Sequence, residues 1–191
     1  MVTLEEFKAV LEDNTVSDLA IVQGYITHGS PFVFMGDEKK YYSLKKIIAD
    51  YFKLNPLSII MIGSAKLGFS INPLQLWKPF NDESDFDMVI ISDGIFRKFW
   101  GELLDFNIGL QVRTVDEEKK YRSFLKYFFK GWLRPDFFPF EYAGRKEWND
   151  FFKSISYGEW GNCKITGAIF YDMNFYESYH IRNIRDIRKG G

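Results

Sequence analysis

Two aspartates near the middle of the chain, Asp85 and Asp87, have the residue type and spacing to do chemistry. They open an apolar segment, 86–92, that predicts a β-strand. Because side chains alternate along a strand, both carboxylates point to one face, about 7 Å apart at the backbone. Two neighbouring carboxylates offer the hard oxygen ligands that suit Mg²⁺, or Mn²⁺ in its place. The pair therefore predicts a divalent-cation site.

A small-residue turn precedes this pair by about twenty residues. The apolar segment 59–62 predicts another strand and ends in Gly63-Ser64. A glycine permits close backbone approach to a phosphate, and Ser64 adds a hydroxyl and a backbone N–H. Lys66 is interpreted either as a cation that neutralises phosphate or as a solvated loop lysine. Ser84 is interpreted as a further nucleotide contact, or as a turn or cap residue.

In this order, the motifs resemble the signature of the nucleotidyltransferase superfamily. That superfamily includes DNA polymerase beta, the aminoglycoside nucleotidyltransferases and small bacterial nucleotidyltransferases. Its signature is a Gly-Ser turn after the first core strand and Asp-x-Asp at the start of the second. The matching residues are Gly63, Ser64, Asp85 and Asp87, within roughly a fifth of the chain.

The resemblance implies an activity, a cofactor and a choice of partners. The activity is Mg²⁺-dependent transfer of a nucleoside monophosphate from a nucleoside triphosphate to an acceptor, with release of pyrophosphate. Small stand-alone members occur in bacterial toxin–antitoxin and antiphage systems. They indicate a protein or RNA as the acceptor, and an antitoxin or other protein as a partner.

Enzymes of this superfamily usually add a third carboxylate from the next core strand, and the sequence does not assign it clearly. The best downstream strand covers 164–171, and the acid at its end is Asp172. We take Asp172 as the predicted third catalytic acid. Asp136, Glu141 and Asp105 are alternatives, and water or substrate would complete the site if none of these acids reaches it.

Length and composition limit the possible classes of protein. The chain has 191 residues, a formal net charge of -1 and one cysteine, Cys163. These values suit a single globular domain and argue against a generally basic nucleic-acid-coating protein. With one cysteine and two separated histidines, the sequence predicts neither an internal disulfide nor a zinc site. No apolar run approaches the length of a membrane span and no secretory signal opens the chain, so we expect a cytoplasmic protein without membrane contact.

The elements that must position these residues follow from periodicity and caps. Thr3 and Glu6 form a capping-box pattern at the start of the first helix. Apolar residues at helical spacing predict helices over 3–12, 40–54, 94–104, 116–130, around Trp148, and over 173–188. Residues 20–36 contain Gly24, Gly29, Pro31 and Gly36, and we expect a loop or short hairpin there.

Three features leave alternatives open. The connection 70–83 is either an anchored surface loop or a lid that shapes the acceptor pocket. The arginines of the last predicted helix either face solvent or contact RNA or triphosphate. Most aromatic residues are expected in a Phe-rich core, but some are candidates to stack on a nucleobase or to form a partner surface: Trp132, Phe137, Phe138, Tyr142 and Trp160.

The sequence as a whole predicts an α/β fold. We expect a single nucleotidyltransferase-like domain over 1–191, with a core over about 40–175 and helical extensions at both ends. A small mixed sheet would carry helices on one side and the active site at its edge. The alternative to an enzyme is a nucleotide-binding regulatory module that has lost turnover, or a partner subunit that acts through its aromatic surface.

Overall fold

Four strands form one mixed sheet in the computed structural model, which describes residues 2–109 and 113–190. The order across the sheet is β1 (Ile59–Ile62), β2 (Phe86–Ile91), β4 (Ile165–Phe170) and β3 (Trp132–Leu133). β2 runs antiparallel to β1 and parallel to β4, and β3 runs antiparallel to β4. The predicted α/β class and mixed sheet are confirmed.

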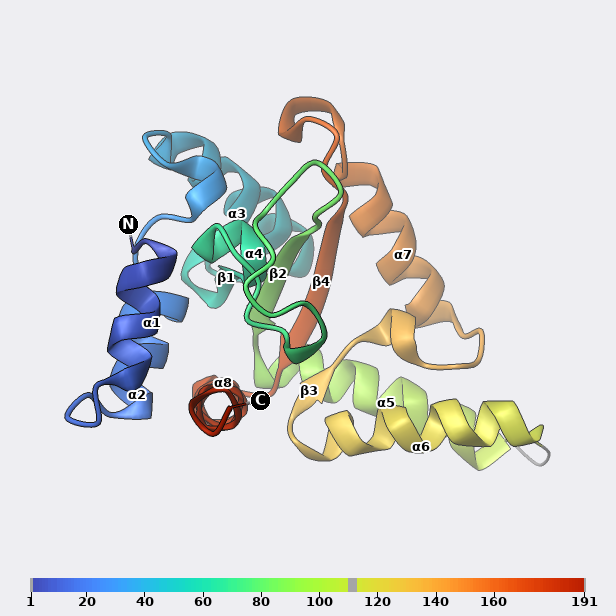
Figure 1. Ribbon diagram of the computed structural model, residues 1–191. Helices are drawn as coiled ribbons and strands as arrows, with labels where there is room; N and C mark the ends of the chain where they lie inside the picture. The colour runs from blue at the N-terminus through green and yellow to red at the C-terminus, as the bar shows by residue number, and fades with distance from the viewer. Residues whose placement is uncertain (1, 110–112, 191) are drawn as a thin grey trace.

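Eight α-helices surround this sheet in the described residues (Figure 1). Most follow the predicted ranges, although the fifth is five residues longer at its end. Their bounds are α1 (Leu4–Glu12), α2 (Asp18–Ile21), α3 (Glu38–Phe52), α4 (Gly63–Leu67), α5 (Asp93–Gly109), α6 (Val115–Phe129), α7 (Ala143–Ile155) and α8 (Met173–Arg188).

The predicted capping box at the first helix is confirmed. The Thr3 hydroxyl accepts from the Glu6 backbone N–H, and the Glu6 carboxylate accepts from the Thr3 N–H. These two bonds satisfy backbone donors that have no partner within the helix. A similar box, formed by Thr114 and Glu117, begins α6.

The expectation of a loop or hairpin over 20–36 is wrong for its first part. The chain is helical there, as α2 followed by a π-helical segment over 22–27. Ile21, Val22 and Ile26 are all buried in one apolar cluster. Their burial outweighs the low helix propensity of Gly24, which faces open space.

Helices cover both faces of the sheet, which corrects the prediction of helices on one side. On β2, Phe86, Met88 and Ile90 belong to a cluster with residues of α3, α5, α6 and α7. Val89, from the alternate position, belongs to a second cluster with residues of α1, α2 and α8. The terminal helices therefore contribute to the core.

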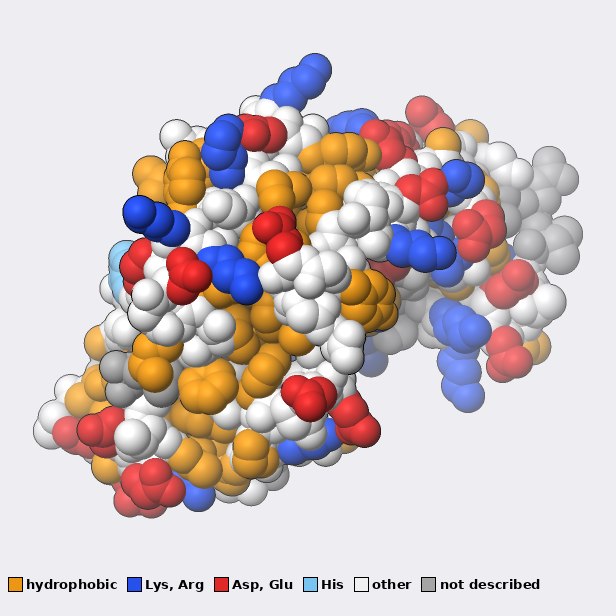
Figure 2. Space-filling view, turned by 90° about the horizontal axis from the view of Figure 1, so that it is seen from above, with side chains coloured by type: hydrophobic (Ala, Val, Ile, Leu, Met, Phe, Trp, Pro, Cys, Tyr) orange, Lys and Arg blue, Asp and Glu red, His pale blue; other side chains and the backbone are white. Residues whose placement is uncertain are grey.

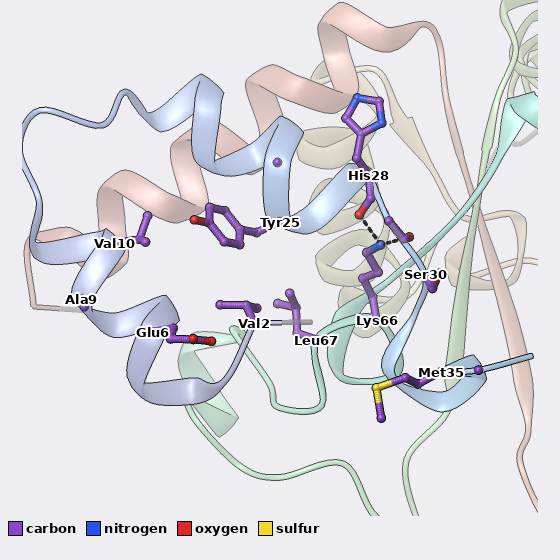
Figure 3. Close-up of a pocket in the computed structure, with 13 residues that line it drawn as sticks. Val2, Glu6, Ala9, Val10, Tyr25, His28, Ser30, Met35, Lys66 and Leu67 are labelled. Atoms are coloured by element: carbon purple, nitrogen blue, oxygen red, sulfur yellow. Dashed lines mark hydrogen bonds between the residues drawn. The ribbon is translucent and has the colours of Figure 1, made fainter. Parts of the chain in front are cut away.

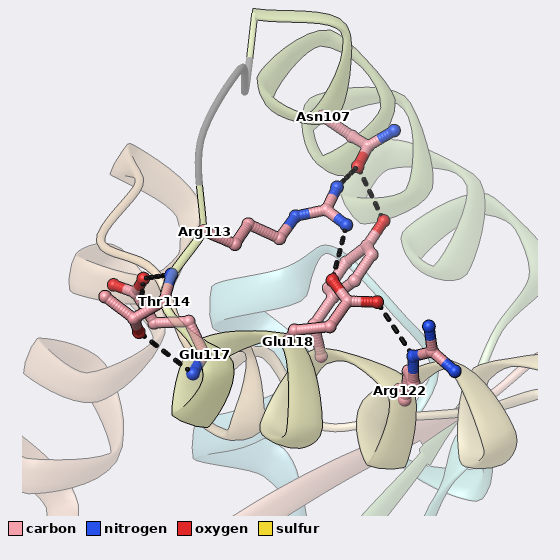
Figure 4. A network of polar contacts seen from close by, with 7 residues as sticks. Asn107, Arg113, Thr114, Glu117, Glu118 and Arg122 are labelled. Atoms are coloured by element: carbon pink, nitrogen blue, oxygen red, sulfur yellow. Dashed lines mark hydrogen bonds and ion pairs between the residues drawn. The ribbon is translucent and has the colours of Figure 1, made fainter.

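Helices α5 and α6 lie side by side and extend away from the sheet (Figure 1). A polar network joins them near their connection (Figure 4). The Asn107 side-chain oxygen accepts from Arg113 and from the Tyr121 hydroxyl, and Glu118 accepts from Arg113 and Arg122. The described helices include none long and apolar enough to cross a membrane.

His180 on α8 is a buried polar side chain with no hydrogen-bond partner at either ring nitrogen among the described residues. It packs against the rings of Phe170, Tyr176 and Tyr179. Burial lowers the pKa of His180 from 6.5 to about 4, because the cation would lose its hydration. The native state therefore holds this imidazole neutral.

We expect the free energy of unfolding to contain a pH-dependent contribution from His180. As the pH falls from 7 to 4, the unfolded chain binds a proton at this residue that the native state binds only near pH 4. This difference lowers the unfolding free energy by about 3 kcal/mol. Urea titrations measure the unfolding free energy at several pH values in this range. As the pH falls from 7 to 4, the unfolding free energy of His180→Leu should rise by about 3 kcal/mol relative to that of the unsubstituted protein. A difference that does not change with pH would contradict this assignment.

Candidate functional site

The predicted aspartates lie at one end of the sheet and line the same cleft. Asp85 directly precedes β2, and Asp87 is the second residue of that strand. The cleft has a volume of about 1250 Å³ and is also lined by Gly63, Ser64 and Ser84. β2 is a central strand, and the pair lies at its start, beside the turn that follows the edge strand β1. The structure brings the two aspartates and the Gly-Ser turn together in one cleft.

Gly63 lies directly against Asp87. Ile62, the last residue of β1, pairs with Asp87 across the sheet, and the chain then turns at Gly63 with a φ of 71°. A Cβ atom added to Gly63 would lie 2.9 Å from the Asp87 Oδ2 atom. Both the positive φ and the close contact with Asp87 disfavour a side chain here. The requirement for glycine at this turn therefore has a structural cause.

Thr166 on β4 is the neighbour of Asp87 on the other side. The two residues are register partners, and the Thr166 hydroxyl donates a hydrogen bond of 2.8 Å to Asp87 Oδ1. β4 is the core strand that follows β2 in the site, and Thr166 is the residue that it places beside the two aspartates. The strand itself was predicted, but its contribution here is a hydroxyl rather than a carboxylate.

The prediction that Asp172 supplies a third carboxylate is corrected by its position. Asp172 is the N-cap of α8, where its carboxylate accepts from the Phe175 N–H at 3.0 Å. It follows Thr166 by six residues along β4, which corresponds to about 20 Å in an extended strand. Asp172 therefore lies toward the opposite end of the sheet from Asp87.

The alternative acids do not line the cleft either. Asp136 forms an ion pair with Arg134, Glu141 forms one with Arg145, and Asp105 is exposed on α5. Within the described part of the chain, no group of three or more His, Cys, Asp or Glu side chains is placed to hold a metal ion. The site consists of two carboxylates beside a hydroxyl.

Lys66 does not reach this site, which corrects its prediction as a phosphate ligand. After Gly63 the chain forms the short helix α4, and the Lys66 side chain is 4% exposed. Its ammonium donates to the backbone oxygens of His28 and Gly29 (Figure 3). It lines a separate cavity of about 800 Å³ beside α1, and burial lowers its pKa to about 8. Lys66 therefore joins α4 to the segment after the π-helical turn.

Two cations that the sequence reasoning did not single out act on the aspartates instead. The Lys164 ammonium lies 3.8 Å from Asp85 Oδ2, and Arg134 follows β3 and lines the cleft. Lys164 immediately precedes β4, so its position depends on the pairing of β4 with β2. A basic residue at the start of a predicted core strand was the available signal.

Asp87 is a partly desolvated carboxylate. Burial raises its pKa, while the Thr166 hydrogen bond and the charge of Arg134 oppose this shift; the nearby Asp85 carboxylate raises the pKa further. A divalent cation between the two aspartates would offset both the desolvation and the repulsion. The donor set therefore fits a hard cation such as Mg²⁺.

Ser84 lines the cleft and closes a local turn. Its hydroxyl accepts from the Asn81 N–H at 3.1 Å and donates to the Asn81 side-chain oxygen at 3.2 Å. In this conformation Ser84 has the turn role that the sequence left open. Residues 70–75 also line the cleft, so this connection forms one of its walls.

Comparison with protein-family models, curated proteins and solved structures finds no match for this chain.

The close contact between Gly63 and Asp87 leads to a matched pair of substitutions. Gly63→Ala should lower the unfolding free energy by about 1–2 kcal/mol, because alanine is strained at positive φ and its methyl group meets the Asp87 carboxylate. Gly24→Ala is the control, since it lies in a helical segment with open space around its Cα, and we expect it to be stabilising. Urea unfolding measures both. Equal effects of the two substitutions would contradict the described contact.

Proposed function

We propose that the protein is an Mg²⁺-dependent nucleotidyltransferase that transfers a nucleoside monophosphate from a nucleoside triphosphate to an acceptor. The observation that carries the proposal is the meeting of Asp85, Asp87 and Gly63 in one cleft. Two carboxylates beside a turn that admits backbone contact are the parts that a metal–triphosphate complex needs. The order of these motifs along the chain supports the same family.

The residues have distinct roles in this proposal. Asp85 and Asp87 hold Mg²⁺ or Mn²⁺, and Thr166 orients Asp87 through the hydrogen bond to Oδ1. Gly63 and Ser64 receive the phosphates at the turn. When bound, the cation polarises the α-phosphate and balances the charge that develops on the leaving pyrophosphate.

The reaction that these roles support is a substitution at the α-phosphorus. The acceptor oxygen forms a new bond to that phosphorus, the bond to the β-phosphate oxygen breaks, and pyrophosphate leaves. Glu83 and Asp186 also line the cleft, but no group of three His, Cys, Asp or Glu side chains among the described residues is placed to hold a metal. We therefore assign the acceptor proton to water or to a substrate oxygen. The chain's contribution is to position the reactants and to balance charge.

The biological setting is also a proposal. A nucleoside triphosphate substrate fits the cytoplasmic location expected from the sequence. A role in a toxin–antitoxin or antiphage system, with an antitoxin or another protein as partner, is supported by the small size of the chain and by its resemblance to stand-alone nucleotidyltransferases.

Turnover provides the direct test of this proposal. The protein is incubated with each γ-labelled nucleoside triphosphate, Mg²⁺ and a cell extract as the source of acceptor, and the labelled pyrophosphate released above the level of the extract alone is measured. Asp85→Asn and Asp87→Asn should each reduce its release at least about 100-fold, because one metal ligand is lost, and EDTA should abolish it. Asp82→Asn is the matched control, as an exposed acid of the same loop outside the cleft. Release that survives both ligand substitutions would contradict the proposal.

A nucleotide-binding module without turnover is the second candidate. It is favoured by Thr166 beside Asp87, where a third carboxylate would stand, and by the remote position of Asp172. This candidate predicts metal-dependent binding of a triphosphate, measured by calorimetry, with no pyrophosphate released from any of the four nucleotides.

A further inference from the structure

Four aromatic side chains form a connected surface in the cleft, on the wall formed by α6, β3, the helical turn Pro135–Phe137 and α8. We call this surface the aromatic platform; it consists of Tyr127, Trp132, Phe137 and Tyr179. The Trp132 ring is 4.9 Å from Tyr127, 5.9 Å from Phe137 and 6.3 Å from Tyr179, between ring centroids. The planes of Trp132 and Tyr179 differ by 5°.

The platform is more exposed than the aromatic core of the protein, although Trp132 and Tyr179 also pack against the second apolar cluster. Phe138 and Trp160, which the sequence also left as stacking candidates, are buried, with Phe138 only 1% exposed. Phe137 is 51% exposed and lines the cleft. Apolar rings that remain accessible inside a concave site offer flat surfaces to a ligand.

Cations accompany these rings. The Lys130 ammonium lies 5.4 Å from the centroid of the Tyr127 ring, and Arg182 lines the same wall from α8. Neither has an acidic partner within 4.0 Å among the residues that the structure describes. Arg134 also lies over Phe137, but its charge is paired with Asp136. Asp186 is the acid on this wall.

Lys130 and Arg182 are local cations, because the chain has a formal net charge of -1 and no general excess of positive charge to attract a polyanion. On the face seen from above in Figure 2, Lys and Arg side chains are interspersed with acidic and hydrophobic ones and form no continuous basic surface. Stacked rings with a few cations suit single strands, whose bases are free to stack, better than duplexes.

The platform is aligned with the aspartates. β3 runs antiparallel to β4, and Trp132 pairs with Phe170, which follows Thr166 by four residues. The separation along the sheet is about 13 Å, or about four stacked nucleotides at about 3.4 Å each. The cleft volume of about 1250 Å³ exceeds the roughly 300–1,000 Å³ of a pocket for one small ligand. There is room for a nucleotide at the carboxylates and for a second substrate on the platform.

We propose that the aromatic platform binds single-stranded nucleic acid, so that the acceptor is the end of an RNA or DNA strand rather than a protein hydroxyl. The role of this strand as the acceptor rests on the proposed function, whereas its binding to the platform requires neither metal nor turnover. The bases stack on Phe137 and Trp132, and Lys130 and Arg182 contact phosphates. The strand then directs its end toward Asp85 and Asp87.

The test is binding of a labelled oligonucleotide in the absence of turnover. Fluorescein-labelled ten-nucleotide single strands of RNA and of DNA are titrated with the protein in EDTA, without nucleoside triphosphate, and fluorescence anisotropy is measured. Phe137→Ala should weaken binding about 5- to 100-fold, because a base loses its stacking partner. Phe129→Ala is the matched control: it removes a ring that is 90% exposed on α6 outside the cleft, and should leave binding unchanged.

Charge is tested separately from stacking. Arg182→Met should reduce the slope of log Kd against log salt concentration by about one. A duplex of the same sequence should bind more weakly than the single strand. Preference for RNA over DNA, or the reverse, would identify which acceptor strand is used.

Two outcomes would overturn the proposal: no oligonucleotide binding by the unsubstituted protein, or equal binding by Phe137→Ala and Phe129→Ala. Labelling of a protein in an extract, together with absent oligonucleotide binding, would identify a protein acceptor instead.

Failure of the proposed function would give a different set of results. Oligonucleotide binding would persist in Asp87→Asn and depend on Phe137, while no triphosphate would be turned over by any variant.

Discussion

The parallel pairing of β2 with β4 is the constraint on which the candidate site depends. It places Thr166 beside Asp87 and fixes one carboxylate oxygen with a hydrogen bond, while β1 places Gly63 against the other oxygen. It also brings Lys164, the residue before β4, to Asp85. A carboxylate held between two strands keeps its orientation without a bound cation, at the cost of partial desolvation.

Two apolar clusters on opposite faces hold this pairing in place. Phe86 and Met88 are buried on the side of α3, α5 and α7, so the strand cannot slip by one residue without exposing them and burying Asp87 in the same cluster. The other face is divided: Val89 packs against the helices, whereas Asp87 faces the cleft. The register that stabilises the core is therefore also the register that turns the Asp87 carboxylate toward the cleft.

Local patterns predicted the parts of the site that depend on neighbours in sequence. Asp85 and Asp87 share a face because of strand alternation, and a glycine is required where the chain leaves β1.

The parts that depend on tertiary structure were not predicted. Lys66 was assigned to the phosphate site wrongly because the direction of its side chain depends on α4, a helix of five residues where a loop was expected. Thr166 was missed because it lies 79 residues from Asp87, and strand register between distant segments leaves no pattern in a single sequence. The helical start of 20–36 was missed because burial outweighed Gly24. Exposure of Phe137 and burial of Phe138, adjacent residues of one type, likewise follow only from tertiary packing.

A crystal structure with Mg²⁺ and a non-hydrolysable nucleoside triphosphate tests the central claim most directly. The account predicts one Mg²⁺ ion with oxygens of both Asp85 and Asp87 at about 2.1 Å, and triphosphate oxygens completing its coordination beside Gly63. A triphosphate bound in the cavity next to Lys66, or the two carboxylates without a shared cation in the presence of bound triphosphate, would contradict it.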